Sequence, residues 1–171
     1  MKKIKESIEI GGRELTIETG LLAKQASGSV LITYGETIAL VTATSSKGHE
    51  DDRGFFPMSV EYREKFYASG KIPGGFFKRE ARPSEREILA ARLTDRPLRP
   101  LFPKGFNNET GIVINVLSYD GQNEPDILGT IGASAALHIS DIPWDGPVAS
   151  VRMGKVDGKL VINPTSEEML N

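Results

Sequence analysis

Residues 125–140 read PDILGTIGASAALHIS, and this stretch decides the fold. Pro125 and Asp126 open a helix, because proline is tolerated at a helix start and an acidic side chain suits the first turn. Glycine and alanine recur through the residues that follow. Such small side chains indicate close packing against another layer, so we expect this helix to lie on a β-sheet.

Alternating and β-branched runs on both sides of this helix predict the strands of the sheet. A two-residue loop that begins with glycine, Gly35-Glu36, predicts a hairpin with a type II′ turn. Asp157-Gly158 predicts a second hairpin with type I′ chemistry. The expected strands are residues 4–10, 13–18, 29–34, 37–44, 55–62, 112–119, 148–155 and 159–162.

A second helix is predicted after residues 74–87, which read GGFFKREARPSERE. Ser84 and Glu87 have the spacing of a capping box, which satisfies the first backbone N–H groups of a helix. We expect the helix to run from about residue 86 to 95, because the residue before Pro97 is biased away from helical geometry. Its predicted buried stripe consists of Ile88, Leu89 and Leu93.

The composition is that of ordinary globular material, with 39% hydrophobic and 26% charged residues in a chain of 171. The first residues are charged and alternate like a strand, so neither a signal peptide nor a membrane helix is expected. The absence of cysteine excludes disulfides and thiolate metal sites, and it fits a cytoplasmic location. Thr165 and Glu168 form another capping box just before the last residues, so we expect a chain cut inside a longer protein.

Positive charge is concentrated in one segment, although the net charge of the chain is −2. Residues 71–104 contain nine Lys or Arg and four Asp or Glu, a local net of +5, which leaves −7 for the remainder. All seven phenylalanines lie between Phe55 and Phe106. A basic, aromatic segment on an acidic domain favours single-stranded nucleic acid as a partner. A solvated helix face beside core phenylalanines explains the same composition equally well.

Few residues suggest catalysis. With no cysteine and two histidines, no nucleophile and base can be assembled. His138 lies in the apolar helix, where we expect it to be packed or hydrogen-bonded, and His49 lies in a polar loop. The carboxylates of residues 50–52 could hold a divalent cation, but their spacing fits no known cage and a solvated loop is favoured. No phosphate-binding Walker sequence is present.

A longer stretch carries a specific resemblance. Residues 67–103, YASGKIPGGFFKREARPSEREILAARLTDRPLRPLFP, closely resemble the first ribonuclease-PH-like domain of the bacterial polynucleotide phosphorylase family. The segments IETGLLAKQASGSVLI, FFPMSVEY and NEPDILGTIGASAALHISDIPWDGPV extend the likeness, in order, over essentially the whole chain. The resemblance implies an α+β, ribonuclease-PH-like fold of the ribosomal protein S5 domain 2-like type, with a mixed sheet and helices packed on it. Residues 1–171 would be the first such domain, truncated at its C-terminal end.

The resemblance also implies an activity and an assembly. Members of this family degrade mRNA from its 3′ end with inorganic phosphate, release nucleoside diphosphates, and can run in reverse. They carry two ribonuclease-PH-like domains and C-terminal KH and S1 domains, and three subunits form a ring. Mg²⁺ or Mn²⁺ and phosphate would bind in the second domain and not in this chain. The implied partners are single-stranded RNA, two further copies and other RNA-degradation proteins, with no membrane.

By the same resemblance, one loop lines the channel of the ring and grips RNA. Aromatic faces stack on any base, at about 1–3 kcal/mol per base, and cationic side chains neutralise phosphates without reading sequence. The family usually has two arginines after the phenylalanines, whereas Lys78 takes the first place here, which keeps the charge and loses the bidentate fork. Gly74 and Gly75 would let the backbone approach the channel axis. The expected RNA-binding residues are Phe76, Phe77, Lys78, Arg79 and Arg82, and Arg92, Arg96 and Arg99 are expected at RNA or at interfaces.

The turn before the glycine- and alanine-rich helix predicts that this chain has no catalytic residues of its own. In the family, the matching turn of the second domain binds phosphate through hydroxyls and backbone amides. Residues 120–126 hold three acids and no Ser or Thr, which should repel phosphate. Two alternatives stay open: a non-catalytic RNA-binding ring subunit, and a single-domain enzyme of the ribonuclease PH type. The acidic turn argues against the second.

Overall fold

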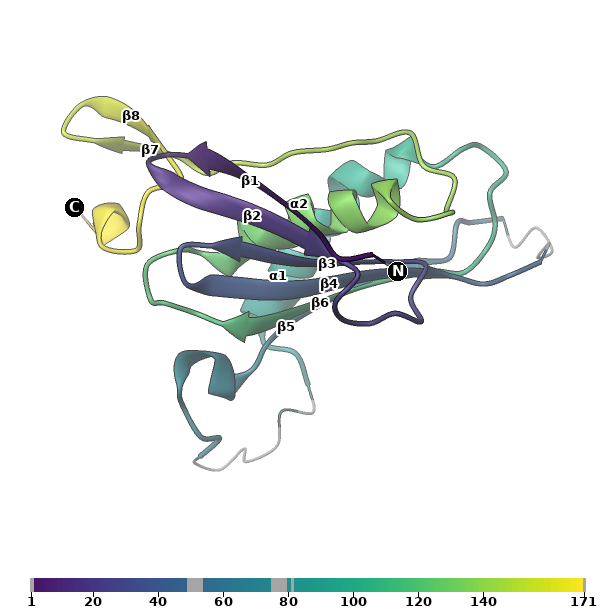
Figure 1. The fold of residues 1–171 in the computed structure, drawn as a ribbon, viewed down its shortest axis with the longest axis horizontal. Coiled ribbons are helices and arrows are strands. Elements are labelled where there is room, and N and C mark those ends of the chain that lie inside the picture. Colours follow the sequence, from purple (N-terminus) through teal and green to yellow (C-terminus); the bar gives the residue numbers. More distant parts are fainter. Residues whose placement is uncertain (1, 49–53, 75–79, 81, 171) are drawn as a thin grey trace.

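The computed structural model describes residues 2–48, 54–74, 80 and 82–170. A six-stranded sheet in the order β1-β2-β3-β4-β6-β5 forms one layer, and two helices cover one of its faces (Figure 1). Only β5 and β6 run parallel, so the sheet is mixed and the predicted α+β fold is confirmed. The elements are β1 (Ile4–Ile10), β2 (Arg13–Thr19), β3 (Gly28–Tyr34), β4 (Thr37–Ser45), β5 (Met58–Glu64), α1 (Glu85–Leu98), β6 (Thr110–Ser118) and α2 (Pro125–His138).

Helix α2 lies directly on the central strands, as its small residues predict. A Cβ atom added at Gly132 would come within 2.6 Å of Val41 Cγ2 on β4. One added at Gly28 on β3 would come within 1.9 Å of the carbonyl oxygen of Ala136. Because no side chain fits at these points, the glycines set how closely the helix approaches the sheet.

The predicted hairpin turns have the expected glycine geometry. Gly35 has a φ of +60°, which the first position of a type II′ turn requires. Asp157 and Gly158 both have positive φ, at 48° and 78°, as a type I′ turn requires. They join β7 (Met153–Val156) to β8 (Lys159–Ile162), which form a separate two-stranded sheet.

Two strand predictions differ from the structure at their ends. The strand predicted over residues 55–62 is Met58–Glu64, because Phe56 turns away from the sheet and packs on the rings of Phe102 and Phe106, with centroids 4.6 and 5.7 Å apart. The strand predicted over residues 148–155 begins only at Met153. The residues before it run beside α2, where the backbone N–H of Val148 donates to Ser134 Oγ at 2.8 Å.

The buried stripe predicted for α1 is wrong. Ile88, Leu89 and Leu93 are 45%, 63% and 56% exposed. The helix approaches the sheet and α2 through a different face, and Thr94 Oγ1 lies 3.2 Å from Thr130 Oγ1 of α2. The residues that α1 buries are Glu87, Ala90, Thr94 and Leu98.

Helix α1 also continues past its predicted end before Pro97. Leu98 is completely buried, and its carbonyl oxygen accepts a hydrogen bond from Trp144 Nε1 at 3.1 Å. The Arg99 guanidinium pairs with Asp95 one turn earlier, at 2.6 Å. These tertiary contacts outweigh the local preference of the residue before proline, so Pro97 lies inside the last turn.

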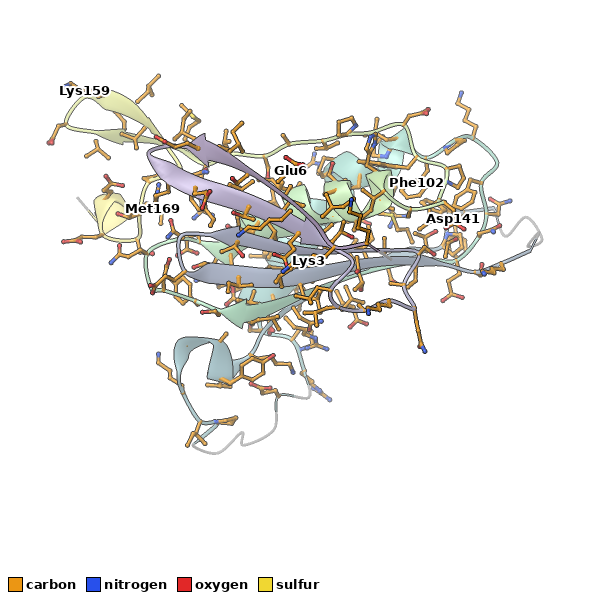
Figure 2. The ribbon with its side chains drawn as sticks, in the orientation of Figure 1. Lys3, Glu6, Phe102, Asp141, Lys159 and Met169 are labelled. Atoms are coloured by element: carbon orange, nitrogen blue, oxygen red, sulfur yellow. The ribbon has the colours of Figure 1, made fainter. Side chains whose placement is uncertain are left out.

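The C-terminal hairpin and the loops that follow the two helices lie at opposite ends of the molecule. Lys159 on the β7–β8 hairpin and Met169 lie at one end, whereas Phe102 and Asp141 lie at the other (Figure 2). His138, expected to be packed or hydrogen-bonded, is exposed in the last turn of α2, although its neighbour Leu137 is buried there. His49 and residues 50–52 lie outside the described residues.

Candidate nucleic-acid interface

The predicted RNA-binding segment leaves the body of the protein between β5 and α1. Phe76, Phe77, Lys78 and Arg79 lie outside the described residues, as does Gly75. Gly74 and Arg82 are described and are exposed. The structure therefore places the two ends of the segment, and Arg82 makes no hydrogen bond or ion pair with the other described residues.

The leading end of the segment is a short 3₁₀ helix, η1 (Phe66–Ser69), which projects from the β5 side of the sheet (Figure 1). Ala68 is buried, and its carbonyl oxygen accepts a hydrogen bond from the backbone N–H of Tyr119 at 2.8 Å. Gly70 ends the helix in the left-handed conformation, with φ 68°. These contacts attach η1 firmly to the end of β6.

The returning end is held by Glu80, a residue that the sequence did not single out. Glu80 Oε1 accepts a hydrogen bond from the backbone N–H of Phe66 at 2.8 Å, and Oε2 lies 3.1 Å from Lys65 Nζ. The hydrogen bond from Phe66 and the one from Lys65 lower the pKa of Glu80, so the carboxylate is charged at neutral pH. No local pattern predicts this contact, because the partners are 14 residues apart.

The start of α1 is fixed by the capping box that the sequence predicts. Ser84 Oγ accepts from the backbone N–H of Glu87, and Glu87 Oε2 accepts from the backbone N–H of Ser84 at 2.6 Å. Glu87 Oε1 also accepts from the backbone N–H of Glu64 at 2.9 Å, which joins the helix to the end of β5. A carboxylate expected only to cap the helix is therefore buried and also ties it to the sheet.

The three arginines predicted at RNA or at interfaces divide into two kinds. Arg99, the C-cap of α1, is held within the chain: it pairs with Asp95 and donates to the carbonyl oxygens of Phe56 and Met58, at 3.0 and 2.9 Å. Arg92 and Arg96 are exposed and make no hydrogen bond or ion pair with other described residues. Of the three arginines predicted at RNA or interfaces, Arg99 thus has a structural role within this chain.

Arg86, which the sequence did not single out, lies at the centre of an ion-pair network. Its Nε is 3.3 Å from Glu64 Oε1, and its Nη2 contacts Glu124 Oε2. Burial lowers the pKa of Arg86, but these two carboxylates outweigh burial and raise it. The neighbouring Tyr62 phenol donates to Glu64 Oε1 at 2.8 Å, and burial followed by the Glu64 charge raises its pKa.

A cavity of about 210 Å³ opens beside this network, between η1 and the start of α2. Arg86, Lys65 and Tyr119 line it, together with Glu64 and Phe66. Glu64 and Glu124 neutralise Arg86, and Glu80 neutralises Lys65. Of the cations that line the cavity, Lys71 alone has no carboxylate partner among the described residues.

The turn before α2 turns its polar groups inward. Asp120 Oδ1 accepts from the backbone N–H groups of Gln122 and Asn123, both at 2.8 Å, and Oδ2 accepts from the Asn123 side chain at 2.6 Å and from Glu36 N–H at 3.1 Å. Burial raises the pKa of Asp120, but hydrogen bonds, led by those from Asn123, outweigh burial and bring it to about 2. The N–H groups of Gln122 and Asn123 are therefore occupied by a carboxylate and are not available to a phosphate.

The other acids near this turn are also paired. Asp126 Oδ2 lies 2.5 Å from Arg152 Nη2. Glu124 Oε1 accepts from Ser166 Oγ at 3.1 Å, a contact across 42 residues that the sequence could not reveal. Within the part of the chain that the structure describes, no three His, Asp or Glu side chains are grouped so as to hold a metal ion.

Comparison with known proteins places this geometry in a family. Residues 11–143 match the 3′ exoribonuclease family, domain 1, and residues 146–171 match domain 2 of the same family. The chain belongs to the 3′ exoribonuclease family. Among the described residues, no helix is long and apolar enough to cross a membrane.

Two curated relatives of this family share high identity with the chain. It is 63% identical over 164 residues to a polyribonucleotide nucleotidyltransferase of Thermomicrobium roseum, and 61% identical over 162 residues to one of Heliobacterium modesticaldum. These alignments cover 96% and 95% of the chain, and 21% and 23% of the relatives. The chain therefore spans about a fifth of the length of the relatives that it matches.

Two solved structures share the fold. Rice (Oryza sativa) Rrp46 superposes with a TM-score of 0.66 at 18% identity, over 99% of this chain and 72% of that one. The Archaeoglobus fulgidus exosome with RNA bound to the active site gives a TM-score of 0.60 at 20% identity, over 98% and 68%. At such identities the likeness shows the ribonuclease-PH-like fold alone.

Proposed function

We propose that residues 1–171 belong to a longer phosphorolytic exoribonuclease, which degrades RNA from the 3′ end with inorganic phosphate and releases nucleoside diphosphates. The observation that carries this proposal is the 63% identity to a polyribonucleotide nucleotidyltransferase over nearly the whole chain. In the proposal, residues 1–171 are the first ribonuclease-PH-like domain, in a homotrimeric ring in the cytoplasm. Mg²⁺ or Mn²⁺ and phosphate bind in a second such domain.

In this assembly, residues 1–171 supply scaffold and an RNA-binding loop. Phe76 and Phe77 stack on bases, while Lys78, Arg79 and Arg82 contact phosphates, a combination that grips RNA without reading its sequence. The exposure of Arg82, and its lack of a partner among the described residues, support this role. Arg92 and Arg96 remain available for RNA or for an interface between domains.

We further propose that this domain performs no phosphorolysis itself. The support is the occupied turn before α2, where Asp120 takes the N–H groups that a phosphate would need. Arg86 is likewise held between two carboxylates, so it adds no free cation to an anion site.

The test is to incubate the 171-residue chain with oligoadenylate RNA, inorganic phosphate and Mg²⁺ or Mn²⁺, and to measure nucleoside diphosphate release by chromatography. We expect none above the rate without protein. The longer protein, assayed in parallel, should release ADP. Reproducible release by the chain alone would overturn the assignment of catalysis to another domain.

A further inference from the structure

The loop that carries the proposed RNA-binding residues begins and ends at one residue, Phe66. The backbone N–H of Lys71 donates to the carbonyl oxygen of Phe66 at 3.0 Å. The backbone N–H of the same Phe66 donates to Glu80 Oε1 at 2.8 Å. The ten residues 71–80 are therefore closed into a loop at Phe66, by a backbone contact at one end and a side-chain contact at the other.

We propose that Glu80 is a positioning residue for RNA binding: its carboxylate, held by Phe66 N–H and Lys65 Nζ, fixes the returning end of the loop against the sheet. The inference rests on the proposed function, because the loop matters only if it grips RNA. Glu80 itself touches no RNA in this account.

Glu80 binds the start of η1, and η1 is itself attached to the sheet. The contact therefore links the returning end of the loop to the sheet. Lys65 is the N-cap of η1, and Phe66 is its first residue. The next turn of η1 is tied to the sheet by Ala68, whose side chain is buried and whose carbonyl oxygen accepts from Tyr119 N–H. Because Glu80 binds Phe66, its carboxylate is held in a fixed position relative to the end of β6.

Among the described residues, the next fixed point after Glu80 is the capping box at Ser84. Without the Glu80 contact, the closed segment therefore grows from residues 71–80 to residues 71–84. Longer closed segments sample more conformations, and ordering them on binding costs affinity. The expected loss for Glu80→Ala is about two- to fivefold in RNA affinity, because the added loop entropy is small and the lost charged contact is exposed.

Two substitutions of Glu80 separate its hydrogen bond with Phe66 from its charge interaction with Lys65. Glu80→Ala removes both the acceptor for Phe66 N–H and the charge beside Lys65. Glu80→Gln keeps an oxygen that can accept from Phe66 and loses only the charge, so its affinity should lie between those of wild type and Glu80→Ala. The matched control is Glu9→Ala, because Glu9 is an exposed carboxylate on β1.

The experiment uses the longer protein and fluorescent oligoadenylate of about 20 nucleotides. It measures the Kd, the KM and kcat of phosphorolysis, and the midpoint of thermal unfolding. We expect Kd and KM to rise for Glu80→Ala, with kcat and the midpoint unchanged, and no change for Glu9→Ala. A positioning role predicts this split, whereas a merely structural role lowers kcat and the midpoint together and overturns the inference.

Phe77→Ala, measured beside these variants, distinguishes this inference from the proposed function. If Phe77→Ala weakens RNA binding and Glu80→Ala does not, the positioning role of Glu80 is wrong, whereas the RNA-binding role of the loop is retained. If neither variant changes the affinity, the proposed function fails and the inference fails with it.

Discussion

Helices α1 and α2 have the same length, 14 residues, and cover the same face of the sheet, but they differ in how many of their residues are buried. Helix α2 buries ten of its residues, and glycine and alanine let it approach the strands closely. Helix α1 buries four and turns its arginines and larger apolar side chains outward. The difference indicates that α2 holds the domain together, whereas α1 presents a surface.

The largest effect is expected where α2 touches the sheet. Gly132→Val should lower the free energy of unfolding by about 3 kcal/mol, because even a Cβ there would lie 2.6 Å from Val41 Cγ2. Leu93→Ala, on the exposed face of α1, should change it by less than about 1 kcal/mol. Urea unfolding followed by circular dichroism measures both, and equal losses would contradict the contrast between the helices.

Asp120, in the turn before α2, makes the stability of the chain depend on pH. The folded pKa of Asp120, about 2, is below its ordinary value of 3.8, so its contribution to stability is present above about pH 4 and is lost as the pH falls through about 2. After allowance for partial exposure, that contribution is about 1 kcal/mol. Asp120→Asn should therefore destabilise the chain at pH 7 and match wild type near pH 2. A difference between them that does not depend on pH would rule out this role for the Asp120 charge.

The smallest effect separates two arginines on α1. Arg86→Met should cost about 0.5–1 kcal/mol, because it leaves Glu64 and Glu124 without their shared cation at a partly exposed site. Arg92→Met, which breaks no contact among the described residues, serves as the matched control and should cost nothing measurable. Thermal unfolding at low and high salt tests the pair, and the Arg86 loss should shrink with salt.

The sequence predicted α2 well and α1 poorly, for a physical reason. Repeated glycine and alanine in a helix indicate close packing. The residues PDILGTIGASAALHIS therefore predicted correctly that this helix packs on the sheet. The spacing of Ile88, Leu89 and Leu93 fits any amphipathic helix, and only tertiary packing shows that Ala90 and Thr94 face the sheet instead. Periodicity therefore indicated that a helix exists without indicating which face it buries.

The RNA-binding residues stay a prediction, whereas the contacts that hold the ends of their segment are seen in the structure. Charge and aromatic content favoured residues 71–104, the family resemblance assigned residues 76–82, and local spacing predicted the Ser84–Glu87 capping box. The Glu80 contact with Phe66, the carboxylates around Arg86 and the internal commitment of Arg99 all join distant parts of the chain. Such contacts depend on the fold and leave no pattern in a single sequence.

We propose that this domain grips RNA through one loop, and the dependence of RNA affinity on salt concentration is the decisive measurement. In the longer protein, Phe77→Ala should weaken oligoadenylate binding at least about fivefold at every salt concentration, because it removes a stacking face. Arg82→Glu should weaken binding and reduce the salt slope by about one, because it removes a phosphate contact. Unchanged affinity and an unchanged slope in both variants would contradict the account.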